Sequence, residues 1–320
     1  MNEEITMVPG CDGLPLHTYV WSGSDASSSG SPKAVIFLIH GQNERAGRYH
    51  RFAEALVDAG YAVVASDLRG HGKTVAAQRP ETQWGVPGHM ADDDGWNKAV
   101  RDLELVTQEA KKRFPGVPLY LFGHSMGSIL AQNLIMKRDD RFDCMMLAGC
   151  WGGRTPDRVI LRLLIWLQYF VLGRRSPGAW IDALTFDVFL KPFEPIRTAA
   201  DWLTRDPDEA DKFVDDPLVG QSSSCQHWID FANAYAYVDN VGSIRRISKD
   251  VPVSFWAGGQ DPVSNFGKGF EALKRNYAMA GLDPEAYFFE HCRHELLNEL
   301  ERDEITAQMI AWFDGVSSRS

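Results

Sequence analysis

This 320-residue sequence is poor in cysteine, and its five cysteines are scattered singly along the chain. They are odd in number, and none has the Cys-x-x-Cys spacing that is typical of metal and redox sites. Disulfide frameworks belong mainly to small secreted proteins, so this pattern indicates reduced thiols in a cytoplasmic protein. The five are Cys11, Cys144, Cys150, Cys225 and Cys292.

The sequence also has no surplus of basic residues, no signal-peptide pattern in its first residues and no long apolar run. Acidic residues outnumber basic ones by 43 to 33, and the formal net charge is −10. Nucleic acid is therefore not expected as a partner, because phosphate binding needs a basic face. Residues 1–5 have neither the basic start nor the apolar core of a signal peptide, and no apolar run is long enough to span a bilayer. We expect a cytoplasmic protein; the sequence carries no signal for its oligomeric state.

Apolar strands alternate with amphipathic helices through most of the chain. The segments 34–39, 61–66 and 144–148 are apolar almost throughout, as expected for strands that are buried on both faces. Residues 4–21 are expected to form an antiparallel hairpin ahead of them. Helices are expected over 265–280 and, at the end of the chain, over about 296–313. The sequence therefore predicts an α/β fold with a mostly parallel central sheet and helices on both faces.

This alternation stops after residue 150 and resumes near Val251. The interval between is aromatic and helix-like, and it follows the sixth predicted strand. We interpret it as a helical cap over the carboxyl ends of the strands, where open α/β sheets bind their ligands. The expected division is a core of residues 1–150 and 241–320 and a cap, or lid, of residues 151–240.

A serine lies between two glycines in the stretch 123–127. An apolar strand is expected before it, over 118–122, and a helix after it, over 128–137. A strand, a serine and a helix in this order predict a nucleophile elbow, which exposes the serine oxygen at the sheet edge. Ser125 is therefore the candidate nucleophile. Gly123, His124 and Gly127 are expected to support the turn.

A serine hydroxyl needs a base, and the base needs a third group that orients it. On this sheet architecture an acid and then a histidine are expected after late strands. Asp261 follows the strand at 251–256, and we assign it as the acid rather than as a simple turn residue. His294 precedes the last helix, and we prefer it as the base over His291, which we expect to be structural. A metal site at His291, Cys292 and His294 is disfavoured, because a second ligand pair is absent.

Hydrolysis through a tetrahedral intermediate also needs donors for the developing oxyanion. The backbone N–H of Met126, next to the candidate nucleophile, is the first expected donor. The second is expected from the loop after the strand at 34–39, and we assign it to the backbone N–H of Gln42. His40 and Gly41, which precede Gln42, are expected to support the mouth of the site.

Together these motifs resemble the α/β-hydrolase superfamily and, within it, the bacterial lysophospholipase and monoacylglycerol lipase-like group. The stretches that carry the resemblance are 40–44, 67–72, 123–127, 294–298 and, in the cap, 201–207 with 216–218. The resemblance implies a serine hydrolase that cleaves carboxylic esters of single-chain lipids through an acyl-enzyme, without a cofactor or metal. The alternatives are a short-chain carboxylesterase and a non-catalytic ligand receptor on the same fold.

One cap segment, 159–172, is apolar on nearly every side if it is helical. Five arginines lie in or near it: Arg154, Arg158, Arg162, Arg174 and Arg175. One interpretation is a lid that lines an acyl tunnel and makes peripheral contact with the inner face of a membrane. The other is a helix packed on the core or on a second subunit. Under the first interpretation the residues expected to contact the acyl chain are Leu163, Trp166, Leu167 and Phe170.

Overall fold

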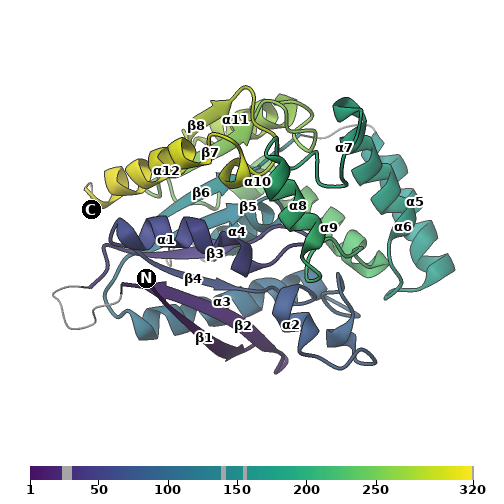
Figure 1. Ribbon diagram of the computed structural model, residues 1–320, viewed down its shortest axis with the longest axis horizontal. Helices are drawn as coiled ribbons and strands as arrows, with labels where there is room; N and C mark the ends of the chain where they lie inside the picture. The colour runs from purple at the N-terminus through teal and green to yellow at the C-terminus, as the bar shows by residue number, and fades with distance from the viewer. Residues whose placement is uncertain (24–30, 138–141, 154–156, 319–320) are drawn as a thin grey trace.

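The computed structural model describes residues 1–23, 31–137, 142–153 and 157–318, and one eight-stranded sheet forms its centre (Figure 1). The strand order is β1-β2-β4-β3-β5-β6-β7-β8. β2 pairs antiparallel with β1 and with β4, and all other neighbours are parallel. The strands are β1 Asn2–Pro9, β2 Pro15–Ser22, β3 Val35–Ile39, β4 Ala62–Ser66, β5 Leu119–His124, β6 Cys144–Ala148, β7 Val253–Gly258 and β8 Glu285–Phe289.

Helices cover both faces of this sheet (Figure 1). α1 and α12 pack on one face, and α3, α4 and α11 pack on the other. The short helix α2 follows β4. The bounds are α1 His50–Asp58, α2 Gly72–Ala76, α3 Gly95–Arg113, α4 Met126–Lys137, α11 Lys268–Ala280 and α12 Arg302–Ser317. The predicted α/β fold with a mostly parallel sheet is therefore confirmed.

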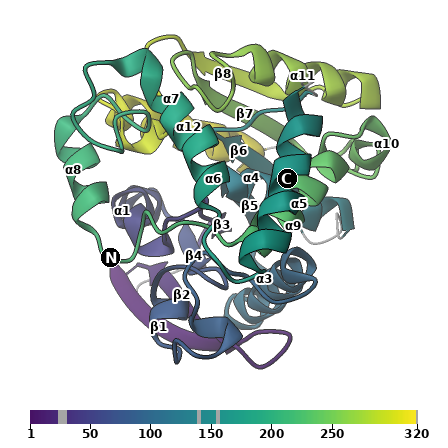
Figure 2. The same ribbon diagram turned by 90° about the vertical axis from the view of Figure 1, so that its right-hand side faces the viewer.

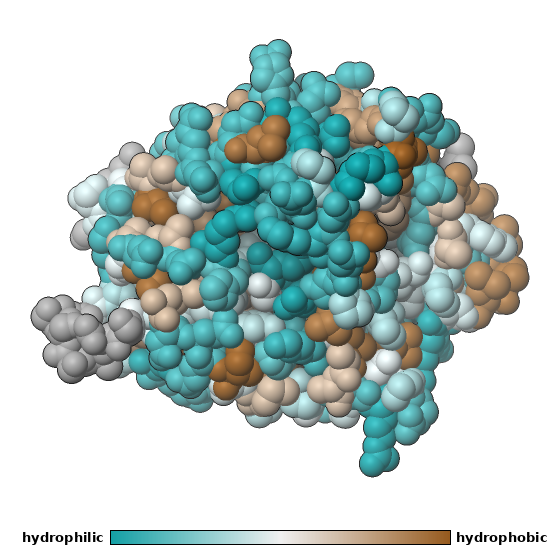
Figure 3. Space-filling view, in the orientation of Figure 1, coloured by the Kyte–Doolittle hydropathy of each residue, from teal (hydrophilic) through white to brown (hydrophobic). Residues whose placement is uncertain are grey.

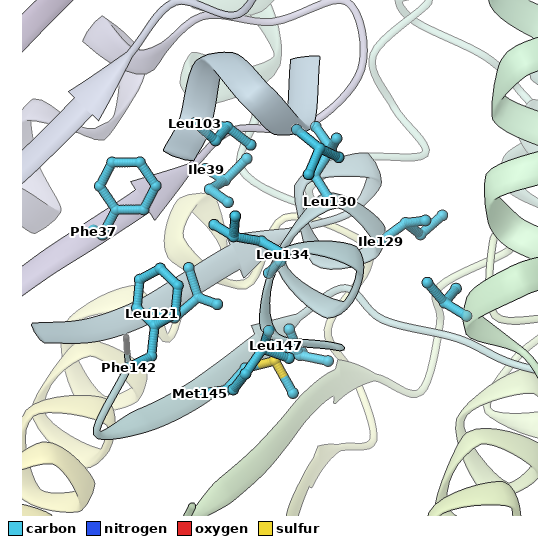
Figure 4. Close-up of a cluster of buried hydrophobic side chains, with 14 of the residues drawn as sticks. Phe37, Ile39, Leu103, Leu121, Ile129, Leu130, Leu134, Phe142, Met145 and Leu147 are labelled. Atoms are coloured by element: carbon cyan, nitrogen blue, oxygen red, sulfur yellow. The ribbon is translucent and has the colours of Figure 1, made fainter. Parts of the chain in front are cut away.

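The central strands divide their apolar side chains between two clusters. Phe37, Leu121 and Met145 are paired in register across β3, β5 and β6 and point toward α3 and α4 (Figure 4). The next residues along these strands, such as Phe122 and Met146, join the second cluster with α1 and α12. Because each strand is buried on both faces, its sequence is apolar without alternation.

Two helix boundaries differ from the predicted ones for local reasons. The helix predicted over 265–280 begins only at Lys268, because Asn265 and Phe266 adopt left-handed φ values of 50° and 53°. The helix predicted over 296–313 is a 3₁₀ turn at Leu296–Asn298 followed by α12. Its last turn extends beyond residue 313, to Ser317.

The predicted cap corresponds to a helical segment between β6 and β7, which we call the cap segment (residues 151–240). Figure 2 shows its helices in front of the strand ends. α5 packs on α9 through Ile165 and Ile229. Its helices are α5 Asp157–Leu172, α6 Ala179–Asp182, α7 Val188–Leu190, α8 Pro207–Asp215 and α9 Cys225–Val238, and α10 Val241–Ile244 leads back to the core. Of the helices that the structure describes, none has the length and apolar character to cross a bilayer.

Candidate active site

Ser125 lies at the sharp turn between β5 and α4 and has a left-handed φ of 53°. The turn leaves no room for larger neighbours. A Cβ atom on Gly123 would lie 2.5 Å from the carbonyl oxygen of Gly127, and one on Gly127 would lie 2.2 Å from that of Ile39. Backbone strain of this kind in a non-glycine residue is typical of functional sites, and here it directs the Ser125 hydroxyl away from the sheet.

Three loops bring Ser125, His294 and Asp261 into one hydrogen-bonded chain. His294 Nδ1 lies 3.0 Å from Asp261 Oδ2, and His294 Nε2 lies 2.8 Å from Ser125 Oγ. A carboxylate only accepts, so Nδ1–H donates to Asp261 and Nε2 is free to accept the serine proton. Both His294 and Asp261 are almost completely buried. The other oxygen of Asp261 accepts the N–H of Val263, which fixes the carboxylate.

The loop after β3 faces Ser125 across the mouth of the site. A Cβ atom on Gly41 would lie 3.1 Å from the Ser125 Cβ, so only glycine allows this close approach. His40 holds the loop, because its Nδ1–H donates to the carbonyl of Gly41 and its Nε2 accepts the N–H of Leu68. Gln42 lines the same cavity as Ser125. Met126 follows Ser125 directly and is the first residue of α4.

The carboxylate of Glu44 connects this loop to the elbow. It accepts hydrogen bonds from the backbone N–H of Gly41, the hydroxyl of Tyr49, Nδ1 of His124 and the guanidinium of Arg48. Burial raises the pKa of Glu44, but the hydrogen bond with His124 and the charge of Arg48 outweigh it and hold the pKa well below its ordinary value. Glu44 is therefore a buried, ionised anchor behind the site.

His124 is the partner of that carboxylate. Burial lowers its pKa, but the hydrogen bond and the charge of Glu44 outweigh burial, so the net pKa is raised. Its ring lies 5.0 Å from the ring of His294, and its Nε2 is 3.4 Å from the carbonyl oxygen of His294. Glu295, next in the chain, makes a bidentate ion pair with Arg48. The sequence interpretation placed His124 at the elbow but missed Glu44 and this network.

Ser125 opens into a cavity of about 390 Å³ with mostly apolar walls. The cap segment supplies most of the aromatic wall, and the core supplies Gly41, Gln42, His124 and His294. The aromatic lining residues are Trp151, Phe186, Phe189, Trp202, Phe213, Trp228 and Phe231. Several of these residues do not follow a predicted strand and do not belong to a motif. The aromatic content of residues 151–240 was therefore the only sequence signal that indicated them.

The four cap residues predicted to contact the acyl chain do not line this cavity. α5 turns Ile165 inward, onto Trp228 and Ile229, while the predicted residues lie on its outer side. Leu163, Trp166, Leu167 and Phe170 are 70%, 42%, 51% and 75% exposed. The prediction was wrong because a helix that is apolar all round does not reveal which side is buried.

The arginines near α5 are partly engaged by other groups. Arg175 pairs with Asp92 at 2.5 Å, and Arg174 donates to the carbonyl of Asp92. Arg162 donates to the side chain of Asn233. Arg154 and the side chain of Arg158 lie outside the described residues.

His291 and Cys292 are not part of the site. His291 is exposed, whereas the Cys292 thiol lies 3.5 Å from Glu301 and near the guanidinium of Arg205. Among the described residues, these two and His294 do not converge as a set of metal ligands.

Comparison with known proteins places the chain in a family. The model of the family described as serine aminopeptidase, S33, matches residues 30–301. A monoglyceride lipase homolog of Monkeypox virus is 25% identical over 84% of each chain. Human monoglyceride lipase is 30% identical over 68% of this chain and 61% of its own length. A carboxyl esterase from Bacillus coagulans has a TM-score of 0.86 at 22% identity over 99% of each chain, a likeness of fold.

The family match covers the elbow, the loop after β3, the cap segment and the histidine loop together. The fold and the resemblance drawn from the sequence motifs agree with it. The chain belongs to the serine aminopeptidase S33 family of α/β-hydrolases.

Proposed function

We propose that this protein is a serine hydrolase that cleaves the carboxylic ester of a single-chain lipid through an acyl-enzyme. The observation that carries the proposal is the chain of hydrogen bonds from Asp261 through His294 to Ser125, opening into an aromatic cavity. The names of the viral and human relatives, which describe monoglyceride lipases, support the same class of substrate.

In the proposed reaction, Ser125 Oγ attacks the ester carbonyl while His294 Nε2 takes its proton. The N–H groups of Gln42 and Met126 stabilise the oxyanion of the tetrahedral intermediate. The intermediate collapses with cleavage of the ester C–O bond, and His294 gives its proton to the leaving alcohol. Water then attacks the acyl carbonyl while His294 takes one of its protons; the bond to Ser125 Oγ breaks, the fatty acid is released, and His294 returns the proton to Ser125 Oγ. Asp261 keeps the imidazole oriented and stabilises its charged form.

The walls of the cavity favour a neutral headgroup. Among the described residues that line it, the carboxylates are Glu44 and Glu295, the cationic group is His124, which is paired with Glu44, and there is no lysine or arginine. A phosphate headgroup would lack a free basic partner there, because His124 is engaged by Glu44. This favours a monoacylglycerol over a lysophospholipid as the substrate.

Covalent labelling and substrate series test the proposal. We expect a fluorophosphonate probe to label Ser125 and p-nitrophenyl esters to be hydrolysed with kcat/KM rising from acetate to decanoate, because each buried methylene contributes about 0.8 kcal/mol. Monoacylglycerol should be cleaved faster than lysophosphatidylcholine. A preference for acetate would favour the carboxylesterase, absence of labelling would favour the receptor, and faster cleavage of aminoacyl p-nitroanilides would favour an amidase.

We also propose peripheral contact of α5 with a lipid surface. In Figure 3 hydrophobic residues gather at the edge where Figure 1 places α5 and α6. The exposed apolar residues of this surface are Leu163, Trp166, Leu167, Phe170, Val171, Leu172 and Trp180. Because Arg174 and Arg175 are engaged with Asp92, apolar burial rather than charge is the expected source of affinity.

Vesicle co-sedimentation measures this contact. Leu163→Ser combined with Phe170→Ser should lower binding to phosphatidylglycerol vesicles at least about tenfold, since each side chain contributes roughly 1.5–3 kcal/mol when fully buried. Met279→Ser, on α11 and 61% exposed, is the matched control and should bind normally. Unchanged sedimentation of the double variant would reject the contact. A shift from dimer to monomer in that variant would assign the surface to a second subunit instead.

A further inference from the structure

An aromatic side chain of the cap segment packs on the imidazole that we assign as the base. The ring centroids of Trp202 and His294 are 5.2 Å apart with an interplanar angle of 32°. Trp202 itself is held by Phe186 and Phe189, whose rings lie 5.8 Å and 5.3 Å away. The indole is therefore braced on its cap side and presents its ring to His294.

Hydrogen bonds on both sides of Trp202 tie its loop to the histidine loop. The N–H of Glu295 donates to the carbonyl of Leu203 at 2.8 Å. The guanidinium of Arg293 donates to the carbonyls of Asp201 and Thr204. The residues next to Trp202 and the residues next to His294 are therefore joined by hydrogen bonds. These bonds fix the indole relative to the imidazole.

We propose that Trp202 is a positioning residue that holds the His294 ring in line with Ser125 and stabilises its charged form. The proposal rests on the proposed function, because it assigns His294 as the base. During acylation His294 becomes an imidazolium, and a cation within about 6 Å of an indole ring is attracted by its face. The ring contact therefore strengthens in the transition state, and such an interaction raises kcat rather than substrate affinity.

Three substitutions separate this role from simple lining of the cavity. Trp202→Leu should slow kcat about tenfold, the size of one ring-to-cation contact, for p-nitrophenyl acetate and decanoate alike. It should slow fluorophosphonate labelling by the same factor and leave KM for acetate unchanged. Trp202→Phe keeps a ring and should stay within about twofold of the wild type. Phe231→Leu is the matched control: it lines the cavity, and its ring contacts are with Trp96, His227 and Trp228, so it should raise KM for decanoate without slowing the labelling.

A loss confined to decanoate would overturn the proposal, because it would make Trp202 part of the acyl wall alone. Equal losses in the leucine and phenylalanine variants would overturn it as well. Thermal unfolding checks that each variant is folded, and Trp202→Met replaces the leucine variant if that one is not. If the wild type hydrolyses no ester, the proposed function fails, and labelling rates alone then decide. Slower labelling of Trp202→Leu would support the positioning role, and equal labelling would overturn it.

Discussion

Replacing Ser125 by alanine is expected to lower kcat/KM for esters by about 10⁴-fold or more while the fold stays intact. The hydroxyl is the only group at the elbow that can form the acyl bond in the proposed reaction. Without it, the backbone donors and the cavity leave only the small residual acceleration that binding and an oxyanion hole provide. Steady-state hydrolysis of p-nitrophenyl esters measures the loss, and fluorophosphonate labelling should disappear with it.

Neighbouring residues supply matched controls for this loss. Ser128 lies one turn along α4 and is 1% exposed, and its hydroxyl has no hydrogen-bond partner among the described residues, so Ser128→Ala should keep near-normal activity. His294→Ala should lose as much as Ser125→Ala, and the double variant no more, because the two act as a unit. His291→Ala should leave kcat/KM nearly unchanged, since this side chain is exposed. If it proves the more damaging histidine change, the assignment of the base is wrong.

The core of the fold could be predicted because its determinants are local. Segments such as 34–39 and 144–148 are apolar throughout, and that pattern is dictated by burial on both faces. The prediction of a helical cap after the sixth strand followed from the same alternation, whereas the order of the strands within the sheet was not predicted. Boundaries were less certain: the backbone of Asn265 and Phe266 turns left-handed and delays α11, which no periodicity reveals.

The three candidate catalytic residues could be predicted from the sequence because each of them follows a strand. Ser125, Asp261 and His294 all lie in loops directly beyond β5, β7 and β8, and the structure brings their side chains together. Their catalytic roles stay predictions until they are tested, as does the division into core and cap.

The residues of the cavity wall could not be predicted from the sequence, because tertiary packing decides which side chains line the cavity. Contacts with α9 determine which side of α5 is buried. The apolar sequence of α5 does not show these contacts, so the prediction placed Phe170 on the wrong side of the helix. Trp202 lies in the stretch 201–207 that carried the family resemblance, but its contact with His294 joins residues 92 positions apart. Glu44 was visible in the loop after β3, whereas its four donors come together only in the folded chain.

Replacing Glu44 by glutamine is expected to weaken both stability and activity. Breaking one partner of a buried ion pair costs about 3–5 kcal/mol, because the remaining charges of Arg48 and His124 stay buried. The amide also anchors the N–H of Gly41 more weakly, so the neighbouring N–H of Gln42 loses its fixed position. A misplaced oxyanion donor costs up to about 10²–10³-fold in kcat. Urea unfolding and ester hydrolysis measure the two effects.

The pH dependence of this variant follows from the directions of the two pKa shifts. The lowered pKa of Glu44 means that its stabilisation is present above its ordinary value of 4.5 and is lost as the pH falls below it. The raised pKa of His124 means that its stabilisation is complete below 6.5 and is lost as the pH rises through the folded value. The stability difference from the wild type should therefore be largest between pH 4.5 and 6.5.

Asp102→Asn separates the loss of stability from the loss of activity. Asp102 is also buried and ion-paired, with the guanidinium of Arg69 at 2.7 Å, but neither residue lines the cavity at Ser125. This control should lose a comparable free energy of unfolding and keep the kcat of the folded enzyme. Equal losses of kcat in both variants would mean that Glu44 acts through global stability alone. A fully active Glu44→Gln enzyme would show that the Gly41 N–H does not need the carboxylate to hold the loop.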